Sequence, residues 1–258
     1  YTLAETFNEI IYWEPSNEIN VHNYCHKADG SQFTMLERAN ITTDLMFYAN
    51  RGIKRANPNA KLVMPGLVFD NSPTTGLVPF LEAVYTNINS ANFPTADETV
   101  STCSNDYFDV LNWHPYNFNG DSGLDSSFIV LNRAAYKVAY DNGDGDKNVI
   151  FSEFGYTTTQ SSQYTRTQYE NMQAQYINQD MQNTLNLLPF VDSVIMFRLF
   201  DWEEAAIVTG NPNSIEIGFG LFTSANYGYI RPKKICIELF KQINGQDADL
   251  SPIYQYSN

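Results

Sequence analysis

The feature that most constrains the fold is a regular alternation of short apolar segments with longer amphipathic ones. Five apolar segments, each long enough for a strand, begin near residues 10, 61, 108, 148 and 193. A segment with helical spacing of its apolar residues lies in each interval between them. This alternation predicts parallel strands joined by crossover helices. The apolar runs lack a clean polar–apolar alternation, which is typical of strands covered on both faces.

The expected strands and helices follow from these patterns. We predict strands at 10–14, 61–66, 108–113, 148–152 and 193–198. We predict helices at 32–56, 77–89, 127–140, 163–188 and 232–243, and residues 1–8 resemble the end of a further helix. A (β/α)8 barrel and a doubly wound sheet both satisfy this order. No Gly-rich phosphate-binding loop follows any strand, which argues against a nucleotide-binding sheet.

Conspicuous polar and aromatic residues gather where four of the five predicted strands end. They are Asn17, Glu18, His114, Tyr116, Glu153 and Trp202. In a (β/α)8 barrel the carboxyl ends of the strands meet on one face, which carries the active site. This convergence favours the barrel and places Glu18 and Glu153 in one pocket.

Composition narrows the range of partners. The chain of 258 residues has a net charge of −14 and only 15 Lys and Arg residues. Nucleic acids and anionic membranes need a basic surface, so neither is expected as a partner. No run of about 18 apolar residues is present, so no membrane span is expected. The 17 Tyr, 17 Phe and 3 Trp residues either pack the protein or supply flat surfaces for sugar rings.

Three further patterns raise the question of a metal site. Cys25, Cys103 and Cys236 form neither a metal motif nor a disulfide framework. His22 and His26 flank Cys25, but no fourth ligand has a suitable spacing, so an ordinary loop is expected. The acidic turn at 141–146 does not fit the EF-hand pattern, so a solvated turn is expected there. No cofactor is predicted.

Four short motifs carry a family resemblance. Segment 13–18 (WEPSNE) resembles the W-E-x-x-N-E segment that ends the fourth strand of clan A glycoside hydrolases with a (β/α)8 barrel. Segment 113–116 (WHPY) is similar to the H-P-Y at the end of their sixth strand. Segment 152–155 (SEFG) is similar to the S/T-E-F-G of their seventh strand, and Trp202 stands where their eighth strand carries a Trp.

The end of the chain extends the resemblance. Segments 220–222 (GLF) and 231–233 (RPK) are similar to the lead-in to the last helix of these enzymes. The motifs are most similar to those of glycoside hydrolase families 39 and 5, and they do not distinguish between the two. The motifs occur in the family's order, each at a predicted strand end, and the resemblance covers nearly the whole chain.

The resemblance implies retaining hydrolysis of a neutral or weakly charged glycan. Glu18 would be the general acid/base and Glu153 the nucleophile, with carboxyl groups about 5–5.5 Å apart. Asn17 would bind the sugar 2-hydroxyl, and His114 and Tyr116 would orient Glu153 and the sugar. Trp202 would form the floor of the pocket. Glu14, inside the first motif, would have a supporting role.

Simpler interpretations of the same residues remain open. Glu18 could cap the following turn, and Glu153 could be a solvated strand end. His114 could be a structural hydrogen-bonding residue, and Trp202 could be core packing. A metal-dependent hydrolase using His114 with both glutamates is a further alternative, as is a glycan-binding or scaffold protein that has lost turnover.

The sequence departs from the family in its strand count. A closed barrel needs eight strands, and the first motif here matches strand four. Residues 1–258 are therefore expected to form the C-terminal five-eighths of a catalytic barrel, with strands one to three absent. The natural protein could be longer, the barrel could be completed by a partner chain, or the chain could be a non-catalytic relative. An extracellular or secretory location is expected, and the absence of a visible signal peptide says little about it.

Overall fold

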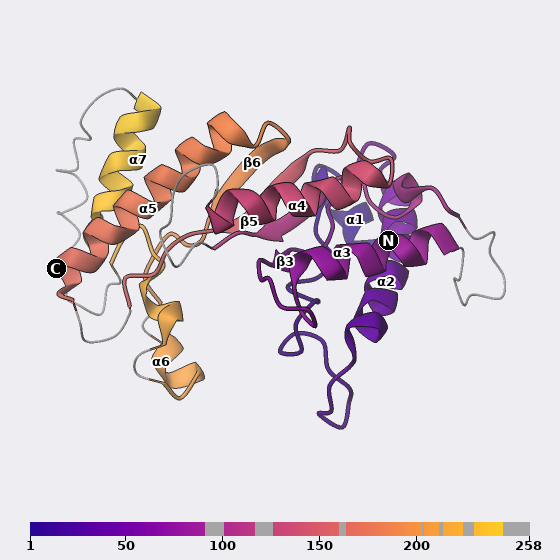
Figure 1. The fold of residues 1–258 in the computed structure, drawn as a ribbon, viewed down its shortest axis with the longest axis horizontal. Coiled ribbons are helices and arrows are strands. Elements are labelled where there is room, and N and C mark those ends of the chain that lie inside the picture. Colours follow the sequence, from indigo (N-terminus) through magenta and orange to yellow (C-terminus); the bar gives the residue numbers. More distant parts are fainter. Residues whose placement is uncertain are drawn as a thin grey trace. The chain divides into compact units, whose positions relative to one another are not determined.

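The computed structural model describes residues 1–90, 101–116, 126–159, 164–202, 204–211, 214–223 and 230–244, in which strands alternate with helices (Figure 1). The chain divides into two compact units, which are described in turn. The first contains residues 1–115, 129–153 and 188–195, and the second contains residues 116–128, 154–187 and 196–258.

The strands of the first unit are parallel wherever their pairing is defined. β1 pairs with β2, and β3, β4, β5 and β6 follow one another in a second sheet. Val63, next to β2, forms a parallel bridge with Val110, so the strand expected at 61–66 is represented by β2 and this bridge, and β3 begins one residue beyond it. The bounds are β1 Tyr12–Trp13, β2 Lys61–Leu62, β3 Leu67–Val68, β4 Leu111–His114, β5 Val149–Phe154 and β6 Val191–Met196. Five strand regions in the predicted order are confirmed.

The predicted helices are also present. In the first part of the chain they are α1 Thr2–Thr6, α2 Met35–Ala56, α3 Leu77–Ser90 and α4 Ser127–Asp141. In the remainder they are α5 Arg166–Leu187 and α7 Lys234–Asn244. The structure also has a short helix that was not predicted, α6 Ala205–Val208, and 3-10 turns at Ser104–Asp106 and Ile215–Gly218. Among the helices described, none combines the length and the apolar character that crossing a membrane requires.

The first turn of α2 shows why this helix begins where it does. The Thr34 hydroxyl accepts a hydrogen bond from the Glu37 backbone N–H, and the Glu37 carboxylate accepts one from the Thr34 N–H. This capping box satisfies two amide groups that the helix leaves without partners. Ala39 and Met46 are fully buried on one face of α2, which packs beside α3 (Figure 1).

The core of the first unit lies around β4 and β5. All four residues of β4 are buried, because the strand has a neighbour on each side and helices cover the sheet. Trp113 is fully buried, and its indole N–H donates to the Asn132 side chain of α4 at 2.7 Å. Its ring lies 6.2 Å from that of Phe151 in β5. The central strands therefore have the two-sided burial that their apolar sequence predicts.

The outer strands do not show this burial. Ile11 and Tyr12 at β1 are 39% and 53% exposed, and Ile195 in β6 is 54% exposed. The prediction of strands covered on both faces is therefore wrong for β1 and β6. Among the described strands, each has a neighbour on one side only, so less of its surface is covered.

The acidic turn at 141–146 differs from the expected solvated turn at one residue. Asp144 is 4% exposed and accepts a hydrogen bond from the Tyr85 hydroxyl at 2.7 Å and another from Ser104. Burial, together with the negative charge of Asp144, raises the pKa of Tyr85. Asp144 therefore joins α3 to the turn, whereas its neighbours Gly143 and Gly145 are exposed as expected.

The second unit contains α5 and α7 packed against each other (Figure 1). Its core includes a buried ion pair between Lys233 and Asp201. The Lys233 ammonium group also donates to Thr158 Oγ1 at 3.0 Å and to the Gly218 carbonyl at 2.8 Å, and Lys233 is completely buried. Burial disfavours both charges, so it raises the pKa of Asp201 and lowers that of Lys233 against their mutual attraction.

A second ion pair of this unit makes its stability sensitive to acid. Arg231 binds both carboxylate oxygens of Glu170 in α5, and Arg166 adds a contact at 3.3 Å. Burial raises the pKa of Glu170, but the hydrogen bond and charge of Arg231 outweigh burial and hold the pKa below its ordinary value of 4.5.

Glu170→Gln is expected to lower the free energy of unfolding by about 2 kcal/mol at pH 7, because a charge-assisted pair is lost. Since the folded-state pKa is depressed, the Glu170 contribution is complete above pH 4.5 and is lost as pH falls through the folded-state value. Urea unfolding of both proteins at several pH values checks this. A difference that stays constant or grows below pH 4.5 contradicts it.

Candidate active site

The segment that carries Glu18 is fixed to the end of the neighbouring strand at Gly66. Asn17 and Gly66 form a parallel bridge, and the Glu18 N–H donates to the Gly66 carbonyl at 2.7 Å. In return, the Gly66 N–H donates to the Glu14 carboxylate at 2.8 Å. Glu14 therefore ties the motif at 13–18 to the adjacent strand, which agrees with the supporting role predicted for it.

Glu18 has an unusual backbone conformation. Its φ angle is 47°, which lies in the left-handed region that residues other than glycine rarely adopt. Such a conformation costs of the order of 1–3 kcal/mol and is found preferentially at functional sites. Glu18 is therefore held by its two backbone hydrogen bonds, to Gly66 and from Val21, at some cost to stability.

His114 joins the two glutamates. Its Nδ1 lies 3.0 Å from Glu18 Oε1 and 3.5 Å from Glu153 Oε2. The His114 side chain is 1% exposed, whereas the Glu18 and Glu153 side chains are 16% and 25% exposed. The histidine is thus buried beneath two carboxylates that are open to solvent. The structure brings together the three ionisable residues that the sequence placed in one site.

The other side of the His114 ring is fixed by a polar network. His114 Nε2 lies 3.0 Å from Ser152 Oγ, which also accepts a hydrogen bond from the Asn112 amide at 2.9 Å. Asn112 donates further to the Met64 carbonyl and accepts from the Ser152 N–H. Asn112 is completely buried, so the network links the ends of three adjacent strand regions beneath the site.

The ring also fits closely against Gly66. A Cβ atom added at Gly66 would lie 2.0 Å from His114 Nε2, where no atom can be accommodated. A side chain at this position would displace the ring from Ser152 and from both glutamates. Only glycine leaves the space that the His114 ring occupies.

Gly66→Ala is expected to lower kcat/KM for any reaction that depends on the His114 and glutamate cluster by roughly 100-fold or more, since displacements of about 1 Å have effects of that size. Gly52→Ala in α2 is the matched control, because its Cβ would meet only the terminal Tyr1 backbone, at 3.3 Å. Steady-state kinetics of both variants checks this. Wild-type kcat/KM in Gly66→Ala would show that the His114 position is unimportant.

The two carboxylates lie close enough to act on one bond. One oxygen of each, together with His114 Nδ1, falls within a group whose atoms are all within 4.8 Å of one another. Inverting glycosidases separate their carboxyl groups by about 6.5–9.5 Å, and retaining enzymes by about 5–5.5 Å.

The remaining predicted site residues have different surroundings. The Asn17 side chain is partly exposed and makes no hydrogen bond to the described part of the chain, so its amide can bind a ligand. Tyr116 belongs to the second unit, where its ring packs 5.3 Å from that of Phe219. Trp202 is in the same unit, with the Arg198 guanidinium 4.7 Å from its ring. The roles of Tyr116 and Trp202 in the site stay predictions.

Another group of potential metal ligands is not assembled. Within the described residues, His22, Cys25 and His26 do not bring three ligand atoms together. All three cysteines are free, as the sequence pattern indicates. The ordinary loop predicted for this segment agrees with the structure.

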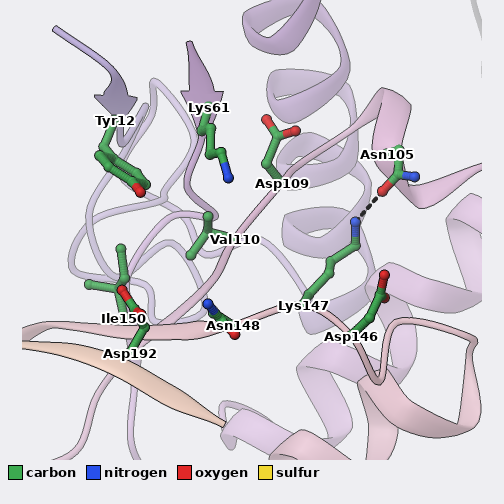
Figure 2. Close-up of a pocket in the computed structure, with 10 residues that line it drawn as sticks. All are labelled: Tyr12, Lys61, Asn105, Asp109, Val110, Asp146, Lys147, Asn148, Ile150 and Asp192. Carbon is green, nitrogen blue, oxygen red and sulfur yellow. Dashed lines mark hydrogen bonds between the residues drawn. The ribbon is translucent and has the colours of Figure 1, made fainter. Parts of the chain in front are cut away.

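A cavity of about 220 Å³ lies at the opposite ends of the strands (Figure 2). Its lining includes Tyr12, Lys61, Asn148 and Asp192, at or next to the first residues of β1, β2, β5 and β6. Figure 2 also shows the Lys147 ammonium group donating to Asn105 across the cavity wall. The amino ends of barrel strands are associated with stability and their carboxyl ends with catalysis, so this cavity is not the candidate site.

The fold resembles solved structures of glycoside hydrolases. GH10 from Paenibacillus barcinonensis matches 100% of this chain and 66% of its own, with a TM-score of 0.54 and 15% identity. A family 39 glycoside hydrolase from the gut symbiont Bacteroides cellulosilyticus WH2 matches 91% of this chain and 41% of its own, with a TM-score of 0.53 and 18% identity. A glucosidase from Croceicoccus marinus matches 84% of this chain and 38% of its own, with a TM-score of 0.51 and 17% identity.

These neighbours are TIM-barrel enzymes, and the chain aligns with part of each barrel. The fold is an incomplete (β/α)8 barrel. The chain spans between 38% and 66% of the three enzymes. No protein-family model and no curated protein matches the sequence. The likeness therefore establishes the barrel fold.

Sequence reasoning missed several residues that shape the site. Gly66 and Asn112 were not singled out, and Ser152 was noted only as part of the motif at 152–155. Gly66 could have been noticed because it ends the second predicted strand, directly after Pro65, where a glycine allows another group to approach the backbone closely. Asn112 was a polar residue inside an apolar strand, and such a residue needs a buried hydrogen-bond partner.

Proposed function

We propose that this barrel is the catalytic domain of a retaining glycoside hydrolase that acts on a neutral or weakly charged glycan. Glu153 is the nucleophile and Glu18 the general acid/base. The observation that carries the proposal is the position of His114 Nδ1, within 3.5 Å of both carboxylates, which lie close together at the end of a barrel sheet. The solved structures that share this fold include glycosidases, which supports the proposed chemistry.

The reaction proceeds through two displacements. The ionised Glu153 attacks the anomeric carbon while Glu18 gives its proton to the departing glycosidic oxygen. The product is a glycosyl ester on Glu153 and a negative charge on Glu18. Glu18 then removes a proton from water, which attacks the anomeric carbon and releases Glu153. The sugar keeps its anomeric configuration because it is inverted twice.

His114 provides one hydrogen-bond donor for whichever carboxylate is negative. When Ser152 donates its hydroxyl proton to Nε2, the proton of the neutral ring stands on Nδ1. That N–H faces Glu153 at 3.5 Å before the first step. It faces Glu18 at 3.0 Å once the charge has moved there. The fixed ring thereby places one N–H within reach of each carboxylate in turn.

The other predicted contacts complete the proposed site. Asn17 binds the sugar 2-hydroxyl, an interaction that strengthens in the transition state. Tyr116 orients the nucleophile and the sugar, and Trp202 stacks against the sugar in the reacting subsite. No cofactor takes part, because the two carboxylates supply both proton transfer and nucleophile.

Exposed apolar side chains on the outer strands support a more complete sheet in the active enzyme. β1 and β6 expose apolar side chains that include Tyr12 and Ile195. Uncovered strand edges promote association with other chains, so proteins rarely leave them open. We propose that additional strands, from the same protein or from a partner chain, cover these edges in the active enzyme. Activity is therefore proposed for the completed barrel, in a secreted protein.

A panel of aryl glycosides of neutral sugars tests the proposal, with the anomeric form of the first product followed by NMR. Retention of configuration is expected. Inversion would rule out the double displacement. Binding of oligosaccharides with no turnover by the completed barrel would favour a glycan-binding protein instead.

A further inference from the structure

The two glutamates and His114 also form a set of metal ligands. Glu18 Oε1, His114 Nδ1 and Glu153 Oε2 are the atoms that converge, and they come from three separate strand ends. Imidazole nitrogen combined with carboxylate oxygen is a ligand set that suits zinc better than magnesium or calcium. Two carboxylates also balance the charge of a divalent ion.

The separations agree with a common bound ion. Zinc bonds to nitrogen and to oxygen are about 2.0–2.2 Å long, so tetrahedral ligand atoms lie roughly 3.4 Å apart. His114 Nδ1 is 3.0 Å from the Glu18 oxygen and 3.5 Å from the Glu153 oxygen. The three atoms are all within 4.8 Å of one another. Small side-chain movements of the two partly exposed glutamates are enough to place all three on one ion.

An outer layer of hydrogen bonds holds the histidine in the orientation that a ligand needs. Metal-binding histidines usually donate their second N–H to a fixed partner, which sets the orientation of the ring. Ser152 Oγ lies 3.0 Å from Nε2 and is itself held by Asn112. When Nδ1 binds a metal ion, the ring proton is on Nε2 instead, and Nε2 donates it to this hydroxyl oxygen. Close packing against Gly66 restricts the ring further. His114 is thus preorganised with Nδ1 directed at the two carboxylates.

We propose that this site binds one Zn²⁺ ion through Glu18, His114 and Glu153, and that zinc reversibly inhibits the enzyme. The binding half stands on the ligand geometry alone, whereas the inhibition half rests on the proposed function. Zinc takes the lone pair with which Glu153 attacks. Zinc also occupies Glu18 Oε1, so this oxygen cannot pass a proton to the departing glycosidic oxygen. A metal ion here blocks the reaction from both sides.

Titration of the metal-free protein with Zn²⁺, in competition with a coloured chelator, tests the binding half. One site is expected, with affinity lowered roughly tenfold or more in Glu18→Gln, Glu153→Gln and His114→Ala. Ser152→Ala, which alters only the outer layer, is expected to weaken binding less. His22→Ala and His26→Ala replace the other two of the three histidines and are the controls, with unchanged affinity.

Glycoside hydrolysis measured with added Zn²⁺ and then with EDTA tests inhibition. The expected result is loss of activity at the concentrations that fill the site and full recovery with EDTA. No binding, or binding lost in His26→Ala and kept in His114→Ala, overturns the inference. If zinc binds as expected while the completed barrel hydrolyses no glycoside, the proposed function fails and the binding site stands. An active enzyme unaffected by bound zinc overturns the inhibition half alone.

Discussion

Glu153→Gln is expected to reduce kcat for glycoside hydrolysis by roughly 10⁴-fold or more, because removal of a nucleophile leaves only binding and positioning. The glutamine amide has nearly the same shape as the carboxylate but cannot attack the anomeric carbon. The CD spectrum and the unfolding midpoint of the Glu153→Gln protein should stay close to those of the wild type. Steady-state kinetics on an aryl glycoside provides the measurement.

Glu18→Gln should behave differently because the proposed role of this residue is proton transfer. Substrates with a sugar as leaving group need the acid, and we expect a loss of roughly 10²–10⁴-fold for them. Substrates with an acidic phenol leave without protonation, so their first step should survive and the glycosyl ester should accumulate. A burst of phenol followed by slow turnover is the expected time course.

Glu82→Gln is the matched control for both variants. Glu82 is an exposed residue of α3 outside the site, so the same change of charge there should leave kcat and KM unaltered. Two results would contradict the assignment. One is near wild-type hydrolysis in Glu153→Gln, and the other is an equal loss in Glu18→Gln for all leaving groups.

Lys233→Met is expected to have the largest effect on stability, lowering the free energy of unfolding by about 3–5 kcal/mol. The ammonium group is completely buried and interacts with Asp201, Thr158 and Gly218. Methionine fills most of the volume but leaves the Asp201 carboxylate buried without its counter-ion. Urea denaturation gives the difference between the two proteins.

Two further variants separate the buried charge from the loss of a lysine. Lys234→Met changes the next residue, whose ammonium group makes one exposed hydrogen bond to Asn171, and should alter stability by less than about 0.5 kcal/mol. Lys233→Met combined with Asp201→Asn removes the uncompensated charge and should recover part of the loss. Equal effects of the two single lysine variants would contradict this interpretation.

The helices and the order of the strands could be predicted because their signals are local. The helix predicted at 32–56 had helical apolar spacing and was followed by Asn57-Pro58, which stops a helix. The observed α2 ends at Ala56, which is the predicted end. The strand at 148–152 was predicted from its apolar run alone and appears as β5. Local signals of this kind depend on residues close together in the chain.

Burial and the details of the site could not be predicted in the same way. The exposure of Tyr12 depends on which strands lie beside β1, and an apolar run is the same whether or not its neighbours are present. The left-handed backbone of Glu18 depends on Gly66, almost fifty residues further along the chain. The proximity of Glu18, His114 and Glu153 followed from strand topology, whereas the Ser152 and Asn112 contacts depend on side-chain geometry.

The proposed mechanism assigns attack on the sugar to Glu153 and proton transfer to Glu18. Incubation with a 2-deoxy-2-fluoro glycoside carrying a good leaving group should trap the glycosyl ester, because the fluorine slows its hydrolysis. Peptide mass spectrometry of the labelled protein is expected to find one fluorosugar, attached to Glu153, and none in Glu153→Gln. A label on Glu18, or turnover of an unmodified glycoside by a protein that never becomes labelled, would contradict the mechanism.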